Sequence, residues 1–291
     1  MVTRKVGIIG YPLTHSISPI FQQAAFDKLD IDIVYKVWEV TSGELSEKIC
    51  DLRKEDVIGA NVTIPYKEVV VAMLDELDSV ASRIGSVNTI VNRGGRLVGY
   101  NTDKFGFIQS LREYARFKAQ DKNILIIGAG GAARAAIRSL VDEGASSVAI
   151  ANRTIGRARR LADEFEGEKS IPIMCLTSNE FQENVSNVDL IVNCTSMGML
   201  NGPAENCTPL NARQIPKNVL VYDMVYTPRE TPLIQEAKKA GASVVGGLHM
   251  LVNQGAKAFE IWTGCNAPIG VMFEAAEMAL APNIHSSLDR A

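Results

Sequence analysis

Cysteine and histidine are scarce in this sequence, and their spacing excludes the common disulfide and zinc frameworks. The five cysteines are far apart with no C-x-x-C pair, and the only histidines are His15, His249 and His285. Disulfide frameworks are typical of short secreted chains, whereas scattered cysteines in 291 residues suit a reducing compartment. Without an H-E-x-x-H spacing, we expect no metal site.

Excess positive charge and long apolar segments are also missing. The formal net charge is -3, so the protein has no excess of positive charge to attract nucleic acid or an anionic membrane. No uncharged run reaches the roughly 18 residues of a membrane span. The apolar run after Lys5 ends at residues 10–12, too early for a signal peptide. We therefore expect a cytoplasmic monomer or homodimer whose partner is a small-molecule substrate.

The sequence does have the composition and patterning of an α/β protein. Hydrophobic residues make up 46% and charged residues 22%, the balance of a globular chain, and the length allows two domains. Strand-like runs alternate with helical stretches, which predicts mainly parallel sheets. The expected strands are 6–9, 34–40, 59–64, 89–91, 96–99, 123–127, 147–151, 171–175, 189–194, 219–222 and 243–245. The expected helices start at Pro19, with Ser18 as the N-cap, and otherwise cover 42–53, 66–77, 105–117, 132–143 and 247–280.

A glycine-rich turn follows the strand at 123–127 directly. Residues 128–133 read G-A-G-G-A-A, which matches G-x-G-x-x-[GA] between a strand and a helix. Gly128 permits the tight turn, Gly130 leaves room for a pyrophosphate, and the helix N-terminus favours the anion. A purely structural turn is the alternative, but the strand, turn and helix in register predict a dinucleotide site.

The end of the next strand indicates which dinucleotide binds. Asn152, Arg153 and Thr154 stand where an NAD site usually has a carboxylate for the ribose hydroxyl, and Arg157 follows one turn later. Guanidinium, amide and hydroxyl groups can bind a 2′-phosphate that a carboxylate would repel. The alternative is that both arginines are simply solvated. We expect NADP rather than NAD.

Polar side chains gather near strand ends in the N-terminal part. Ser16 and Ser18 are two apart, so an extended chain presents both hydroxyls on one side; the alternative is a turn residue and a helix N-cap. Asn61 and Thr63 share one strand face, with Val62 and Ile64 directed to the core. More polar groups follow at Lys67, Asn88–Thr89 and Asn101–Asp103. Ligands bind at such strand ends in open α/β folds.

Taken in order, these motifs resemble the shikimate dehydrogenase family, with its quinate/shikimate dehydrogenase members, from about Gly10 to Gly264. The matching segments are G-x-P-x-x-H-S-x-S-P, N-V-T-x-P-x-K, V-N-T, N-T-D, G-A-G-G-A-A-R-A, N-R-T-x-x-R-A, N-C-T-S-M-G-M, D-M-V-Y with T-P-L, and M-L-x-x-Q-G-A-x-x-F-x-x-W-T-G. The resemblance implies an NADP-dependent dehydrogenase that reversibly reduces 3-dehydroshikimate to shikimate, a step towards chorismate and the aromatic amino acids.

The resemblance also implies an architecture and a set of site residues. Residues 1–103 and 248–291 would form a substrate-binding catalytic domain, and residues 104–247 an inserted Rossmann-like NADP-binding domain, with a cleft between them. The expected catalytic pair is Lys67 and Asp103. The expected substrate contacts are Ser16, Ser18, Asn61, Thr63, Lys67, Asn88, Asp103, Tyr226 and Gln254. The expected cofactor contacts are Gly128, Ala129, Gly130, Gly131, Ala132, Ala133, Asn152, Arg153, Thr154, Arg157, Thr195, Ser196, Met197, Val225, Gly247 and Met250.

Reduction of a ring ketone needs a hydride at carbon and a proton at oxygen. The nicotinamide supplies the hydride. Lys67 suits the proton transfer because a buried lysine exchanges protons near neutral pH, whereas the neighbouring Asp103 favours the ammonium form and fixes its position. His15 is the rival acid–base group. The sequence leaves open whether Lys67 or Asp103 carries the proton.

Three alternatives fit parts of the sequence. A quinate/shikimate dehydrogenase with relaxed NAD or NADP use usually has an acidic residue after the second nucleotide-domain strand, and residues 154–156 offer none. A non-catalytic NADP-binding regulator would lack the acid–base pair, which is present here. A reductase of the glutamyl-tRNA or methylenetetrahydrofolate type lacks the seryl loop and N-V-T-I-P-Y-K. One residue departs from the family pattern: Lys104 replaces a common glycine, and either affects the hinge or the local charge, or is simply solvated.

Overall fold

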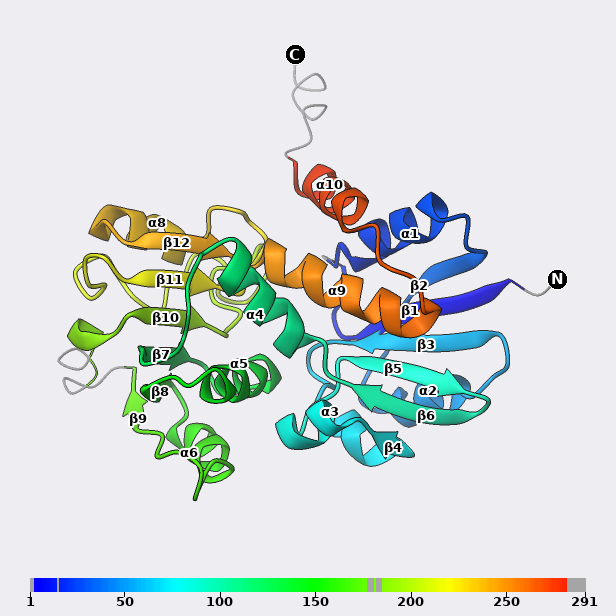
Figure 1. The fold of residues 1–291 in the computed structure, drawn as a ribbon, viewed down its shortest axis with the longest axis horizontal. Coiled ribbons are helices and arrows are strands. Elements are labelled where there is room, and N and C mark those ends of the chain that lie inside the picture. Colours follow the sequence, from blue (N-terminus) through cyan, green and yellow to red (C-terminus); the bar gives the residue numbers. More distant parts are fainter. Residues whose placement is uncertain (1–2, 15, 177–180, 182–184, 282–291) are drawn as a thin grey trace, which may run out of the picture.

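The structure, a computed structural model, describes residues 3–14, 16–176, 181 and 185–281. The chain forms two α/β units, each built on a six-stranded sheet, and the helices α4 (Asp103–Glu113) and α9 (Leu248–Thr263) pass between them (Figure 1). The fold class predicted from the sequence is therefore confirmed.

The N-terminal sheet has the strand order β2-β1-β3-β5-β6-β4. Its strands are β1 (Arg4–Gly10), β2 (Ile33–Glu39), β3 (Val57–Val62), β4 (Glu76–Leu77), β5 (Thr89–Arg93) and β6 (Arg96–Tyr100). β1 is parallel to β2 and β3, whereas β5 runs antiparallel to β3 and β6. Thr89 consequently lies opposite both Asn61 and Tyr100. The segments that follow β3 and β6 and the one that precedes β5 therefore meet at a single edge of the sheet.

Helices cover both faces of this sheet. They are α1 (Ser18–Lys28), α2 (Leu45–Asp51), the 3-10 helix η1 (Val69–Met73), α3 (Ser79–Ile84) and α10 (Ile269–Leu280). Phe21 and Phe26 of α1 pack with Phe259 and Trp262 of α9 in one apolar core, and α2 and η1 supply a second core across the sheet. The indole Nε1 of Trp262 donates to the Ile90 carbonyl at 3.0 Å, which fixes α9 to this sheet.

The second sheet is fully parallel, with the strand order β12-β11-β10-β7-β8-β9. Its strands are β7 (Asn123–Ile127), β8 (Ser147–Asn152), β9 (Ile173–Cys175), β10 (Leu190–Asn193), β11 (Leu220–Asp223) and β12 (Ser243–Gly246), with the helices α5 (Gly131–Asp142), α6 (Ile155–Asp163), α8 (Pro232–Ala240) and the 3-10 helix η2 (Val185–Asn187). The strand order reverses between β7 and β10, and ligands bind beyond the strand ends at such a switch point.

The crossing of α4 and α9 brings catalytic candidates from the two helices together. A Cβ atom on Gly106 of α4 would lie 2.6 Å from the Met250 carbonyl oxygen and 2.8 Å from Cβ of Gln254, both on α9. Only glycine permits so close an approach. As a result Asp103, at the start of α4, lies beside Gln254.

Some local predictions are wrong. Ser18 is the first residue of α1 and Ile17 is its N-cap, so Ser18 does not cap the helix. Residues 66–77 were expected to be helical, yet they form only η1 and β4, in keeping with the β-branched run at 69–71. β3 ends at Val62, so the alternation stops there and Ile64 is 62% exposed instead of buried.

Two further predictions needed correction. The single helix expected over 247–280 is two helices, α9 and α10, because Gly264 takes a left-handed conformation (φ 73°) after α9. Of the two alternatives for Lys104, simple solvation is wrong, because its ammonium group bonds to the carboxylate of Asp142 at the end of α5.

Candidate active site

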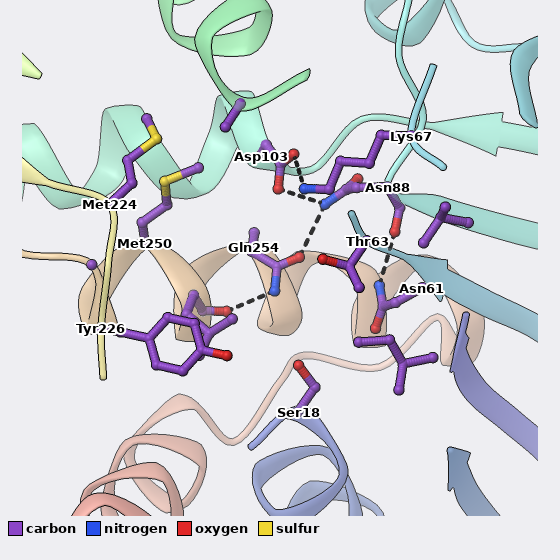
Figure 2. Close-up of a pocket in the computed structure, with 15 residues that line it drawn as sticks. Ser18, Asn61, Thr63, Lys67, Asn88, Asp103, Met224, Tyr226, Met250 and Gln254 are labelled. Atoms are coloured by element: carbon purple, nitrogen blue, oxygen red, sulfur yellow. Dashed lines mark hydrogen bonds and ion pairs between the residues drawn. The ribbon is translucent and has the colours of Figure 1, made fainter. Parts of the chain in front are cut away.

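A cavity of about 150 Å³ lies between the two sheets and collects most of the predicted substrate contacts (Figure 2). Its lining residues are Ile8, Ser18, Asn61, Val62, Thr63, Lys67, Asn88, Asp103, Ala132, Met224, Tyr226, Gly247, Met250, Leu251 and Gln254. They come from the edge of the N-terminal sheet and from α1, from both crossing helices, and from α5 and the segments that follow β11 and β12 of the second sheet. The cavity therefore belongs to the boundary between the two halves of the chain.

Lys67 and Asp103 form an ion pair at the cavity wall. The Lys67 Nζ donates to Asp103 Oδ2 at 2.6 Å, and the two side chains are 17% and 4% exposed. Lys67 follows β3 and Asp103 starts α4, so the pair joins two elements that are distant in sequence. Limited contact with water strengthens the attraction between the two charges and fixes the direction of the ammonium group.

Asn88 holds the carboxylate of Asp103 in place. Its Nδ2 lies 2.9 Å from Asp103 Oδ1 and 3.0 Å from Gln254 Oε1. Its Oδ1 accepts the backbone N–H of Thr102 at 2.7 Å. Asn88 is only 2% exposed, and both the oxygen and the nitrogen of its side-chain amide are hydrogen-bonded. It therefore holds the start of α4 and Gln254 of α9 in fixed positions relative to each other.

The other polar side chains that line the cavity are of two kinds. Some direct a hydrogen-bonding group into the cavity, and others are already hydrogen-bonded to other residues of the protein. Figure 2 shows the hydroxyl-bearing side chains of Ser18 and Thr63 at the cavity, on α1 and after β3. Asn61 lies beside Thr63 (Figure 2), with Oδ1 accepting from the Tyr35 hydroxyl at 2.8 Å and Nδ2 donating to the Asn88 carbonyl at 3.2 Å. Ser16 is half-buried and is not among the lining residues. His15 lies outside the described residues.

Tyr226 closes the cavity from the nucleotide-domain side. Burial raises the pKa of Tyr226 to about 12, so its hydroxyl is a protonated hydrogen-bond donor at neutral pH. The segment before it is anchored by Asp223, which accepts from Asn193 Nδ2 at 2.9 Å and from the Val225 N–H at 3.1 Å. Burial raises the pKa of Asp223 to about 6 against these bonds. Sequence reasoning missed this anchor, because only the fold brings Asn193 and Asp223 together.

The glycine turn adopts the geometry predicted for a dinucleotide site. Gly128 has φ 112°, a conformation that residues with a side chain rarely take, and a Cβ atom there would lie 3.1 Å from Cγ2 of Thr195 after β10. A Cβ atom on Gly130 would meet nothing within 4 Å. The turn therefore leaves open space in front of the α5 N-terminus, where anions are favoured.

A second cavity, of about 510 Å³, extends along this turn. Its lining residues are Thr63, Ile64, Pro65, Lys67, Glu68, Val69, Ala129, Gly130, Gly131, Ala132, Arg134, Arg157, Arg160, Leu161 and Cys194. Thr63, Lys67 and Ala132 line both cavities. A Cβ atom on Gly131 would lie 3.4 Å from Cβ of Lys67. The two cavities thus meet at the ion-paired lysine.

Three arginines make the second cavity basic, and only Arg157 of them was predicted. Arg157 and Arg160 lie three residues apart on α6, and Arg134 lies in the first turn of α5. Glu68 is the one acidic side chain among the lining residues described. The sequence shows these positive charges, but it does not show that Arg160 and Arg134 face the cavity and that the neighbouring Arg159 does not.

The other predicted cofactor residues lie around the same turn. Arg153 and Thr154 are exposed at the end of β8, and Asn152 Nδ2 donates to the Thr154 carbonyl at 2.9 Å. Thr195 receives support from Asn193, whose Oδ1 accepts its hydroxyl at 2.7 Å. Gly247 and Met250 line the first cavity rather than the second. The predicted cofactor residues that line neither cavity are Gly128, Ala133, Asn152, Arg153, Thr154, Thr195, Ser196, Met197 and Val225.

The described residues contain neither a membrane-spanning helix nor a metal-ligand cluster. None of the helices in 3–14, 16–176, 181 and 185–281 is long and apolar enough to cross a membrane. Over the same ranges, no group of three or more His, Cys, Asp or Glu side chains is placed to hold a metal ion.

Comparison with known proteins gives one family along most of the chain. The model of the "Shikimate dehydrogenase substrate binding domain" matches residues 8–90, that of "Shikimate / quinate 5-dehydrogenase" residues 111–242, and that of "Shikimate 5'-dehydrogenase C-terminal domain" residues 247–277. A shikimate dehydrogenase (NADP(+)) from Methanopyrus kandleri is 43% identical over 94% of this chain and 94% of its own length.

Solved structures agree with these sequence matches. A shikimate dehydrogenase in complex with NADP+ has a TM-score of 0.87 at 38% identity, covering 96% of each chain. A shikimate 5-dehydrogenase from Thermus thermophilus in complex with NADP(H) and shikimate has a TM-score of 0.84 at 35% identity, covering 95% of this chain and 100% of the other. Similarity of this extent covers both sheets and the site between them.

Proposed function

The chain belongs to the shikimate dehydrogenase family, and on this premise we propose that it catalyses the reversible, NADPH-dependent reduction of 3-dehydroshikimate to shikimate. The observation that carries the proposal is the Lys67–Asp103 ion pair at the junction of the two cavities. The reaction is a step in the biosynthesis of chorismate and the aromatic amino acids.

The residues around the glycine turn fit NADP(H). Gly130 leaves open space at the α5 N-terminus, where the pyrophosphate is favoured. Arg157 lines the second cavity and Arg153 is exposed just after β8, so both guanidinium groups are available to the 2′-phosphate, and Arg160 adds a third cation one turn further along α6. When bound, NADPH supplies the hydride that reduces the carbonyl carbon.

Proton transfer is the task of Lys67. Its ammonium group donates to Asp103 Oδ2 and retains further N–H bonds for a carbonyl oxygen in the first cavity. As the carbonyl is reduced, Lys67 gives a proton to the developing alkoxide, and in the reverse direction it takes the proton back. Asp103 stabilises the ammonium form and, held by Asn88, fixes its direction.

Substrate recognition falls to the remaining polar wall. Thr63 and Gln254 place hydroxyl and amide groups at the first cavity near Lys67, and Ser18 places a hydroxyl there on the side towards Tyr226 (Figure 2), an arrangement that suits a ring with several hydroxyls. Tyr226 places a neutral donor at the opposite end for the substrate carboxylate. Ser16 joins this proposal as a contact from the loop before α1.

Steady-state rates with two cofactors and two acids test this function against the quinate/shikimate alternative. We expect NADP with shikimate to be the fastest of the four combinations of NADP or NAD with shikimate or quinate. Comparable rates with NAD, or faster oxidation of quinate, would instead support the relaxed enzyme. Absence of turnover in all four combinations would support the non-catalytic regulator.

We further propose a cytoplasmic enzyme that is either a monomer or a homodimer. All of the residues proposed for catalysis and binding belong to one chain, so the reaction does not require a second copy. Sedimentation of the purified protein distinguishes the two assemblies.

The Tyr226→Phe substitution is expected to weaken substrate binding more than turnover. A hydrogen bond to a charged group contributes about 1.5–3 kcal/mol, which corresponds to an increase of roughly 10- to 100-fold in the Kd for shikimate. Calorimetric titration measures the Kd, and steady-state assays measure kcat. An unchanged Kd would show that Tyr226 does not contact the carboxylate.

A further inference from the structure

The first two residues of α4 point to opposite sides of the domain boundary. Asp103 bonds to Lys67 in the active site, whereas Lys104 bonds to Asp142, the last residue of α5 in the nucleotide domain. Lys104 and Asp142 side chains are 26% and 20% exposed. One residue at the start of α4 is therefore catalytic, and the next one ties this helix to α5.

Asp142 has a second cationic partner, from the substrate-binding half. Arg83 of α3 approaches Asp142 Oδ1 at 3.1 Å, and Lys104 bonds to the other oxygen, Oδ2. Both oxygens of one carboxylate are thus occupied by cations from segments outside the nucleotide-domain sheet. We call Arg83, Lys104 and Asp142 the ion cluster.

The opposite end of α5 is also joined to the substrate-binding half by polar contacts. Arg134, in the first turn of α5, lies 3.5 Å from Glu68 Oε2 and 3.5 Å from the Ile84 carbonyl oxygen at the end of α3. The apolar core that contains α5 includes no residue of α3 among those described. α5 is therefore attached to α3 by charged and polar groups instead of by apolar packing.

The direction of α5 matters for the reaction. One end of this helix follows the glycine turn, where Gly131 approaches Lys67, and the other carries Asp142. A helix of this length is a rigid rod of roughly 18 Å, so fixing one end restrains the other. A small rotation at Asp142 would change the distance between the turn and the Lys67–Asp103 pair.

The contacts have the character of a reversible connection. Partly exposed ion pairs are individually weak and are screened by salt, so they can break and re-form as two domains move. Lys104 also lines an open groove of about 510 Å³ with Phe105, Ile108, Arg112 and Lys257, on the side of α4 away from Asp103. An ammonium group released from Asp142 would therefore enter solvent and would not be buried without a partner.

We propose that the ion cluster, in which Arg83 of the substrate-binding half meets Lys104 and Asp142 of the nucleotide-binding half, sets the orientation of α5 towards the active site, and that Lys104 is a positioning residue for hydride transfer. The expected effect on hydride transfer rests on the proposed function, whereas the expected effect on the contact between α5 and its neighbours does not. Breaking the cluster lets α5 swing away from Lys67 and lowers the fraction of molecules in the reactive arrangement.

The kinetic test is a double-mutant cycle measured in single-turnover experiments with NADPH and 3-dehydroshikimate. We expect Lys104→Gln and Asp142→Asn each to slow hydride transfer by about tenfold, and the double variant to be no slower than either, because the two residues act as one unit. Lys104→Arg should retain the rate. The matched control is Lys238→Gln, which breaks an exposed ion pair with Glu230 within the nucleotide domain and should have no effect. Unchanged rates, or additive losses, would overturn the proposal.

The structural test needs no catalytic activity. Amide hydrogen exchange of the full chain should become faster at residues 79–85 and 139–144 in Lys104→Gln and Asp142→Asn, and in the unaltered protein at high salt, but not in Lys238→Gln. Exchange that stays unchanged in these segments would also overturn the proposal. If the unaltered protein failed to reduce 3-dehydroshikimate while the exchange changed as expected, the proposed function would be wrong and the ion cluster would stand.

Discussion

Replacing Lys67 with alanine is expected to lower kcat by roughly 10²- to 10⁴-fold, the usual contribution of a positioned acid–base group. Lys67 pairs with Asp103 at 2.6 Å at the junction of the two cavities, and alanine offers no proton to a reduced carbonyl oxygen there. The Kd for shikimate should change much less, because Ser18, Thr63 and Tyr226 remain. Stopped-flow turnover and calorimetric titration measure the two quantities separately.

Lys122 provides a matched control for this substitution. It also pairs with one aspartate, Asp189, at 3.0 Å, but it lies in the nucleotide domain and lines neither cavity. Lys122→Ala should leave kcat near that of the unaltered protein. If Lys67→Ala instead abolished shikimate binding while bound substrate still turned over at a near-normal rate, Lys67 would be a binding residue and the catalytic assignment would be wrong.

The second large effect concerns cofactor choice. Replacing both Arg153 and Arg157 with glutamine should lower kcat/KM for NADPH by about 100-fold, because hydrogen bonds between charged groups contribute about 1.5–3 kcal/mol each and the two arginines share one phosphate. The kcat/KM of this variant for NADH should stay within a few fold of that of the unaltered protein, since NADH lacks the 2′-phosphate. Steady-state rates with both cofactors give the ratio directly.

Arg159 makes the cofactor experiment specific. It is an exposed arginine on the same helix, α6, but it does not line the second cavity. Arg159→Gln therefore removes one positive charge from α6, as replacing Arg157 does, without removing a proposed contact. Equal losses for NADPH and NADH in the Arg153 and Arg157 variant would contradict a 2′-phosphate site, and an equal loss in Arg159→Gln would indicate a general effect of charge.

Regular strands and the glycine turn were predictable from sequence because their signals are local. The apolar run at 123–127 predicts the strand β7. The glycine that follows it at once, Gly128, predicts the turn, because glycine readily adopts a positive φ. The turn between β5 and β6 also has a local signal, because its two residues, Gly94 and Gly95, are glycines and both adopt positive φ.

Local signals failed where tertiary contacts decide the conformation. Residues 66–77 have helix-like apolar spacing, but they form the 3-10 helix η1 and the edge strand β4, and Val70 of η1 packs in the core beneath the N-terminal sheet. Ser18 was predicted to be the N-cap of a helix that starts at Pro19. α1 instead starts at Ser18 itself, and Ile17 is its N-cap.

The least predictable parts of the site are its long-range polar contacts. Lys104 meets Asp142 and Asn88 meets Gln254, although the members of each pair are distant in sequence. No pattern of residue types indicates such a pair in advance, because it depends on how α4 crosses α5 and α9. The resemblance to the family indicated Gln254, whereas Arg160 and the ion cluster became visible only in the folded chain.

The most direct test of the proposed reaction is to follow hydride and product together. Purified protein is mixed with 3-dehydroshikimate and NADPH in which both hydrogens at the nicotinamide C4 position are replaced by deuterium, and the products are separated and identified by mass. The proposed reaction predicts oxidation of one NADPH for each shikimate formed, with the deuterium on the new carbinol carbon. NADPH oxidation without labelled shikimate, or no oxidation at all, would contradict it.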